Sequence, residues 1–209
     1  MSLDLVTGGL ALTVVACAAG VWFMTRPAAA GSRAVEHLRN KLKKNPGDVD
    51  VRCQLGKALA TQGDIQGSIE QFRICVEQDP KFAPAHHSLG IALMSRGNVP
   101  GALIHLEKAT ALSPHFAEAY SSLGAVYELK GDLFAARAAH MRAVALDPKL
   151  ALAHFNLARV YAASGESKKA ADSLKSAIQL DRGQVTEARS CADFDELLRD
   201  PALRQLIYS

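Results

Sequence analysis

A period of 34 residues is the feature that most constrains this chain. From Val49 to Gln184 the sequence aligns with itself four times without insertions, and the same kinds of residue return at the same places. A Leu followed by Gly or Ala marks each copy: Leu55-Gly56, Leu89-Gly90, Leu123-Gly124 and Leu157-Ala158. Repeats of this length are typical of stacked helical pairs, in which each unit contacts only its neighbours. We therefore expect an all-α solenoid.

Turn and cap signals divide each copy into two helices. A glycine ends the first helix, where a left-handed cap conformation is needed: Gly63, Gly97, Gly131 and Gly165. A polar residue then suits the start of the second helix, Asp or Asn as a side-chain cap and Glu through the helix dipole: Asp64, Asn98, Asp132 and Glu166. Prolines stop the second helix in three copies: Pro80, Pro114 and Pro148. Each copy is thus predicted to be a helical hairpin.

At these residues the sequence resembles the tetratricopeptide repeat family, over about two-thirds of the chain. The resemblance implies an all-α solenoid of four helical hairpins with capping helices. Arg52, His86 and His154 stand where that family often has an aromatic residue, and Tyr120 keeps it. The expected order is a transmembrane anchor (1–24), a basic juxtamembrane linker with a half-repeat capping helix (25–47), a repeat domain (48–184) and C-terminal capping helices (185–209). Within the domain the repeats are 49–82, 83–116, 117–150 and 151–184.

The N-terminal segment is predicted to be a single transmembrane helix. Leu5 to Met24 contains no charged residue, and 20 apolar residues are long enough to cross a bilayer as a helix. The anchor residues that we single out are of three kinds. Leu5 begins the run, Gly9, Thr13, Cys17 and Gly20 are small residues suited to close helix packing, and Trp22 is an interfacial aromatic. A cleaved signal peptide and lipidation at Cys17 are the alternatives, although the N-terminus lacks the cations of a signal sequence.

Charge is distributed unevenly along the chain. Of the net charge of +3, residues 25–47 carry +5, and residues 1–24 and 48–209 carry −1 each. The folded domain is therefore not expected to bind nucleic acid. The cations follow the apolar segment, so the positive-inside rule predicts that the repeats lie in the cytoplasm. The alternative is that the repeat domain lies in the periplasm. Five of the cations in residues 25–47 are also candidates for contact with anionic lipid: Arg33, Arg39, Lys41, Lys43 and Lys44.

The resemblance implies a partner-binding concave face, lined by the first helix of each hairpin. The candidate contact residues there are Lys57, Ile91, Met94, Leu152, Phe155, Asn156 and Arg159. The alternative is that Phe155 packs between repeats and Arg159 is solvated. Only Lys57 is chemically similar to the residues with which chaperone-binding members hold a C-terminal carboxylate, and its position is shifted. A chaperone clamp is therefore not expected.

Catalytic and metal-binding patterns are missing from the sequence. The seven histidines do not show the paired helical spacing of zinc hydrolases, and the four cysteines lack metal or redox spacing. Phosphate-binding loops and nucleophile motifs are absent as well. We therefore expect no enzyme, no cofactor and no metal, but a membrane-anchored adaptor that binds a protein or peptide. The alternative is an accessory or assembly subunit of a larger membrane complex, facing the periplasm if the topology is reversed.

Overall fold

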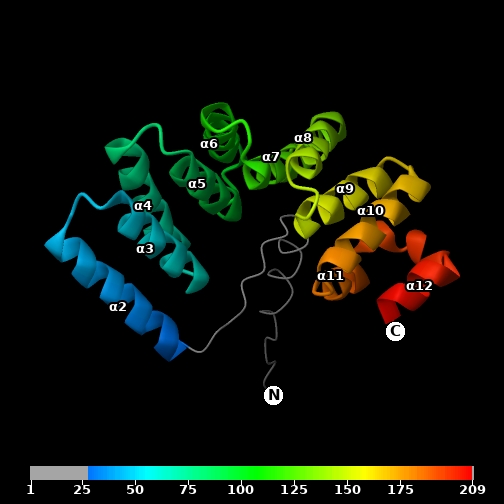
Figure 1. Cartoon of the computed structure of the whole chain (residues 1–209), viewed down its shortest axis with the longest axis horizontal. Helices are drawn as coiled ribbons and strands as arrows, with labels where there is room; N and C mark the ends of the chain where they lie inside the picture. Colours follow the sequence, from blue (N-terminus) through cyan, green and yellow to red (C-terminus); the bar gives the residue numbers. More distant parts are fainter. Residues whose placement is uncertain (1–27, 209) are drawn as a thin grey trace, which may run out of the picture.

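The computed structural model describes residues 28–208, and this part of the chain is a curved row of helices without strands (Figure 1). Its α-helices are α2 (Ala28–Lys44), α3 (Val49–Thr61), α4 (Ile65–Gln78), α5 (Ala83–Ser95), α6 (Val99–Leu112), α7 (Ala117–Leu129), α8 (Leu133–Leu146), α9 (Ala151–Ala163), α10 (Ser167–Leu180), α11 (Gln184–Ser190) and α12 (Pro201–Tyr208). Two short 3-10 turns, η1 (Ala192–Phe194) and η2 (Leu197–Arg199), lie between the last two helices.

Each repeat is a helical hairpin, as the period predicts. The second helix begins with a side-chain cap in three repeats, where Asp64, Asn98 and Asp132 each accept a hydrogen bond from a backbone N–H three residues ahead. Glu166 makes no such cap bond and instead pairs with Arg137 and Lys169. The glycines that end the first helices have φ between 74° and 86°, as expected for left-handed caps: Gly63, Gly97, Gly131 and Gly165.

The curvature follows from unequal packing of the two helix rows. The first helices α3, α5, α7 and α9 contact one another from repeat to repeat, whereas the second helices mainly contact the first helices on either side. The row of first helices is therefore the tighter one, and it lies on the inner, concave side. This places residues 50–61 and their equivalents on a shared surface.

Close approach within a hairpin depends on the small residue after the recurring Leu. A Cβ atom added at Gly124 would lie 2.4 Å from Cε1 of His140 on the partner helix. Most buried apolar positions of the repeat domain are Ala or Leu, and His140 is completely buried. Interdigitation of this kind gives a well-packed hairpin its specificity.

Both ends of the repeat array are covered. Val35, Leu38 and Leu42 of α2 pack on Leu55 and Leu59 of α3, and so complete the half-repeat expected there. Helix α2 begins at Ala28 and continues through Gly31. A glycine in a helix costs only about 1 kcal/mol, which packing on α3 can offset.

Residues 184–208 cover the other end of the array. Phe194, Leu197, Leu203 and Ile207 are buried in one cluster with Leu174 and Ile178 of α10 and with Phe155 of α9.

The predicted anchor lies outside the described residues, together with Leu5, Gly9, Thr13, Cys17, Gly20 and Trp22. Across residues 28–208, no helix combines the length and the apolar character that crossing a bilayer requires.

Candidate functional site

The concave face differs from one end to the other. Of the predicted contact residues, Lys57 is exposed on α3, Ile91 is half-buried on α5, and Leu152 is half-buried on α9. The others are buried: Met94 on α5, and Phe155, Asn156 and Arg159 on α9. The predicted contact residues are therefore exposed on the first repeat, half-buried or buried on the second, and mostly buried on the fourth.

The accessible end is a groove of about 280 Å³ between α3 and α5. It is lined by Asp50, Cys53, Gln54, Lys57, Phe82, Pro84 and Ser88. Lys57 and Asp50 are exposed, and neither forms an ion pair with another described residue. The groove thus offers charges of both signs beside an apolar wall.

His87 links the second repeat to the third in the middle of the face. Its Nε2 lies 2.9 Å from Oγ of Ser122, and its ring meets Phe116 edge-on at 4.8 Å between centroids. Burial lowers the pKa of His87 to about 4, and the positive charge of Lys57 acts in the same direction. The ring is therefore neutral near pH 7 and serves as a packed hydrogen-bonding group.

At the fourth repeat the C-terminal segment covers two of the predicted contact residues, Phe155 and Arg159. Phe155 packs edge-on against Phe194, with 5.4 Å between ring centroids, and the Asn156 amide lies 3.4 Å from the hydroxyl of Ser121. Phe155 thus packs between structural units, as the alternative interpretation has it. Contact of these side chains with a partner stays a prediction, and for Phe155 it requires Phe194 to move.

Arg159 lies in a buried charge network that the sequence did not indicate. Its guanidinium donates to Asp193 at 3.1 Å and lies 3.4 Å from Glu128, which in turn lies 2.9 Å from Nε2 of His140. Burial alone would lower the pKa of Arg159. The negative charge of Glu128 and the other nearby groups together have the larger effect, so the pKa of Arg159 is raised. Arg159 is therefore held in ion pairs rather than solvated, and its contact with a partner stays a prediction. One hint of this network is present in the sequence. His140 is a polar residue at the position where the first repeat has the apolar Phe72.

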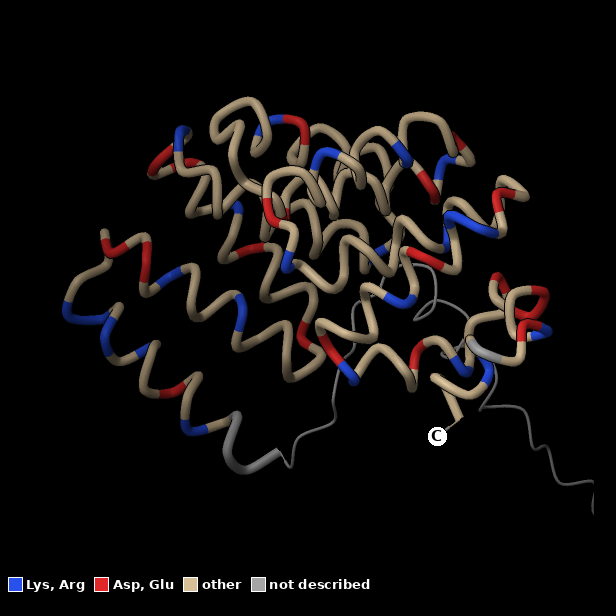
Figure 2. The backbone as a smooth tube through the Cα atoms, turned by 45° about the vertical axis from the view of Figure 1, so that its right-hand side comes forward, with Lys and Arg blue, Asp and Glu red and all other residues tan. Residues whose placement is uncertain are grey.

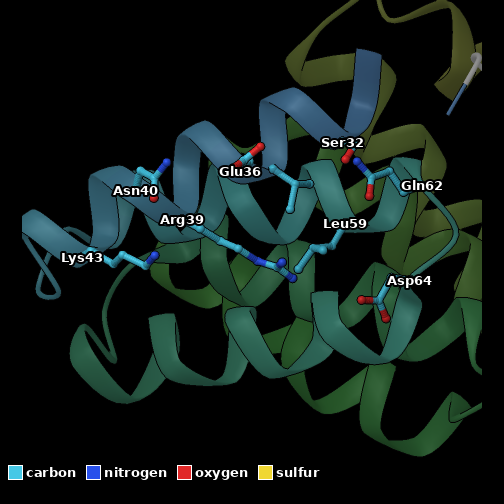
Figure 3. A pocket seen from close by; sticks show the side chains of 9 residues that line it. Ser32, Glu36, Arg39, Asn40, Lys43, Leu59, Gln62 and Asp64 are labelled. Atoms are coloured by element: carbon cyan, nitrogen blue, oxygen red, sulfur yellow. The ribbon is translucent and has the colours of Figure 1, made fainter. Parts of the chain in front are cut away.

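A second groove, of about 440 Å³, lies between α2 and the first repeat. Figure 3 shows its lining residues: Ser32, Glu36, Arg39, Asn40, Lys43, Leu59, Gln62 and Asp64. Helix α2 corresponds to the second helix of a hairpin whose first helix is not among the described residues, and the groove lies beside it. Sequence reasoning found the half-repeat but not this groove.

The basic residues of α2 are all exposed. Arg33, Arg39, Lys41, Lys43 and Lys44 form no ion pair with any described residue. Figure 2 shows them as the blue segments along α2. Within the described residues, the helix therefore presents positive charge that no acidic side chain pairs with, and in the sequence it follows the apolar N-terminal segment.

Histidines and cysteines form pairs but no larger cluster. Nδ1 of His86 lies 3.1 Å from Nδ1 of His105, and Sγ of Cys53 lies 2.9 Å from Sγ of Cys75. In residues 28–208 no three His, Cys, Asp or Glu side chains are grouped so that they would hold a metal ion.

Models of the tetratricopeptide repeat match three parts of the chain. Two described as "Tetratricopeptide repeat" match residues 49–82 and 153–186, and one described as "TPR repeat" matches residues 92–131. Among curated proteins, none matches the chain significantly.

Solved structures share the fold over most of the chain. MamA from Desulfovibrio magneticus RS-1 is 28% identical, with a TM-score of 0.62, and the match covers 74% of this chain and 87% of that one. TTC0263, a thermophilic TPR protein of Thermus thermophilus, is 21% identical, with a TM-score of 0.66 and coverage of 86% and 91%. YrrB, described as a TPR protein with an unusual peptide-binding site, is 16% identical, with a TM-score of 0.60 and coverage of 82% and 89%. The last two likenesses show the fold alone.

Proposed function

We propose that this chain, which contains tetratricopeptide repeats, is a non-enzymatic scaffold that binds a segment of a partner protein along its concave face. The observation that carries the proposal is the groove between α3 and α5, which stays open while the fourth repeat is covered. Its apolar wall, Phe82 and Pro84, gives a partner side chain a surface to bury.

Charge in the groove narrows the class of partner. Lys57 has no ion-pair partner among residues 28–208, and an acidic side chain or other carboxylate of a bound segment would supply one. Gln54, also exposed there, can donate to and accept from the backbone of an extended peptide. The proposed ligand is therefore an extended segment with an acidic group near α3 and an apolar side chain towards α5.

A photoreactive residue placed at position 54 tests the proposal. We expect it to crosslink a partner segment in cells that express the full chain, and we expect the added change Lys57→Glu to abolish the product. The same crosslinker at Glu70, exposed on the second helix of the same repeat, is the matched control. Identical products from positions 54 and 70, unaffected by Lys57→Glu, would contradict binding in the groove.

Membrane attachment through residues 5–24 is the second part of the proposal, with the repeats on the cytoplasmic side. It is supported by the length of the uncharged run and by the exposed cations of α2 that follow it. Labelling of a cysteine introduced at Asn40 from either side of intact membranes tests the orientation. Modification only from the outer side would replace it with the periplasmic arrangement.

A subunit of a larger membrane complex is the second candidate function. Exposed apolar side chains on second helices favour it, since Ile104 is 64% and Phe134 is 76% exposed. Extraction in mild detergent followed by sizing separates the two candidates. A monomeric chain supports the adaptor, and stable co-migration with other membrane proteins supports the subunit.

A further inference from the structure

We propose that Cys53 and Cys75 form a reactive thiol pair that a small disulfide, such as oxidised glutathione, converts to an intramolecular disulfide. Their sulfur atoms lie 2.9 Å apart across the first hairpin, Cys53 on α3 and Cys75 on α4. Sulfur atoms of a disulfide are about 2.05 Å apart, so a small rotation of the two side chains would bring them to bonding distance.

The internal repeats show that this pairing is a special feature of the first hairpin. The residues equivalent to Cys53 are His87, Ser121 and Phe155, and those equivalent to Cys75 are Ala109, Ala143 and Ala177. Alanine therefore satisfies the packing at the second position in every other repeat. A thiol at that position adds chemistry that the fold does not require.

The two thiols differ in access and in acidity. Cys75 is completely buried, whereas Cys53 is 7% exposed and lines the groove between α3 and α5, where a small disulfide can reach it. The hydrogen bond between the two thiols lowers the pKa of Cys53, and the nearby Lys57 adds to that effect. The same bond and burial raise the pKa of Cys75. Cys53 is therefore the thiol that reacts first.

The reaction balances as two exchange steps. The Cys53 thiolate attacks one sulfur of the small disulfide, breaks its S–S bond and releases one small thiol, which leaves a mixed disulfide on Cys53. Cys75 then loses its proton, and its sulfur attacks Sγ of Cys53 and expels the second small thiol. The protein pair loses two electrons and two protons, and the small disulfide is reduced to two thiols. The product links α3 to α4 across the wall of the groove.

The experiment uses the full chain carrying Cys17→Ser, which leaves Cys53, Cys75 and Cys191. The reduced protein is incubated with oxidised glutathione, quenched with a maleimide, unfolded and analysed by peptide mass spectrometry. We expect a Cys53–Cys75 crosslinked peptide and one labelled thiol, that of Cys191. The proposal would be overturned if all three cysteines were labelled after oxidation. It would also be overturned if the folded protein gave the same mixture of disulfides, including ones with Cys191, as an unfolded sample.

Single-cysteine variants, which cannot form the Cys53–Cys75 disulfide, show which of the two thiols reacts first with glutathione. In Cys75→Ala, which copies the other repeats, we expect one glutathionyl group to remain on Cys53. In Cys53→Ser, we expect Cys75 to stay a free thiol because no attacking group faces the groove. The opposite pattern, glutathionylation of Cys75 and not of Cys53, would refute the mechanism. Circular dichroism establishes that each variant keeps its helices.

Discussion

His87 is a residue whose burial makes stability depend on pH. The ordinary pKa of a histidine, 6.5, applies to the unfolded chain, whereas burial lowers the pKa of His87 in the fold to about 4. Protonation therefore favours the unfolded chain, and the contribution of this ring to stability is complete above pH 6.5 and falls towards pH 4. At pH 5 the linkage relation gives a loss of about 2 kcal/mol.

We expect His87→Gln to remove that part of the pH dependence. Urea unfolding at pH 7 and pH 5 measures the free energy of unfolding, and the difference between the two pH values should shrink in the variant. The matched control is His115→Gln, at an exposed position. An unchanged difference in His87→Gln would mean that other groups account for the whole effect.

Arg159 of α9 pairs with Glu128 of α7 and with Asp193 of the C-terminal segment. Its replacement should therefore lower the stability of the fold, whatever its effect on partner binding. Arg159→Ala would leave Glu128, whose side chain is only 10% exposed, with His140 as its remaining partner, and it would remove the ion pair of Asp193 in the C-terminal segment. Loss of a buried ion-pair partner costs about 3–5 kcal/mol, but Asp193 is 39% exposed, so we expect about 2 kcal/mol.

The control for this prediction is Arg137→Ala, which removes a pair that is about one-third exposed and should cost less than about 1 kcal/mol. Both values come from urea unfolding. Equal losses in the two variants would show that the charge network adds nothing beyond a surface pair.

Secondary-structure elements were predictable wherever the period of 34 residues applies. Helix ends at Gly63 and helix starts at Asp64 follow from local backbone chemistry, and these recur in the structure. Beyond Gln184 the register breaks, because Asp193 and Asp195 stand where the fourth repeat has Arg159 and Tyr161. The chain there forms a seven-residue helix and two 3-10 turns rather than a full first helix.

That irregular C-terminal cap should nevertheless be essential for the fourth repeat. Phe194 is completely buried against Phe155, and truncating a buried Phe to Ala costs about 3–5 kcal/mol. We expect Phe194→Ala to destabilise by that amount and to make residues 184–208 sensitive to limited proteolysis. Phe134→Ala, at a residue that is 76% exposed, should change stability by less than about 0.5 kcal/mol. Resistance of Phe194→Ala to both denaturant and protease would contradict a sealing role.

On the scale of the whole molecule, the binding face was only half predictable. The family pattern identified which residues point to the concave side, and Lys57 is exposed there. It did not show that Phe155 and Arg159 would be covered, because the covering residues, Asp193 and Phe194, come from a segment outside the period. Side chains buried by long-range packing leave no local signal in the sequence.

The charge distribution of the whole molecule leads to the last prediction. The exposed cations of α2, which pair with no acidic residue in the part of the chain that the structure describes, stand apart from a repeat domain whose net charge is close to zero (Figure 2). Each Lys near an anionic membrane contributes roughly 1 kcal/mol. A chain shortened to begin at Ala28 should therefore bind vesicles that contain anionic phospholipid and lose that binding at high salt.

Lys41, Lys43 and Lys44 changed together to Gln should weaken this binding by about 3 kcal/mol, which corresponds to more than about a hundredfold. Vesicle sedimentation measures the effect. The matched control changes three exposed lysines of the repeat domain, Lys81, Lys130 and Lys149, and should bind like the parent. If both triple variants lose the same affinity, the attraction depends on total charge and not on α2. If neither loses any, the basic residues of α2 serve only to orient the chain in the membrane.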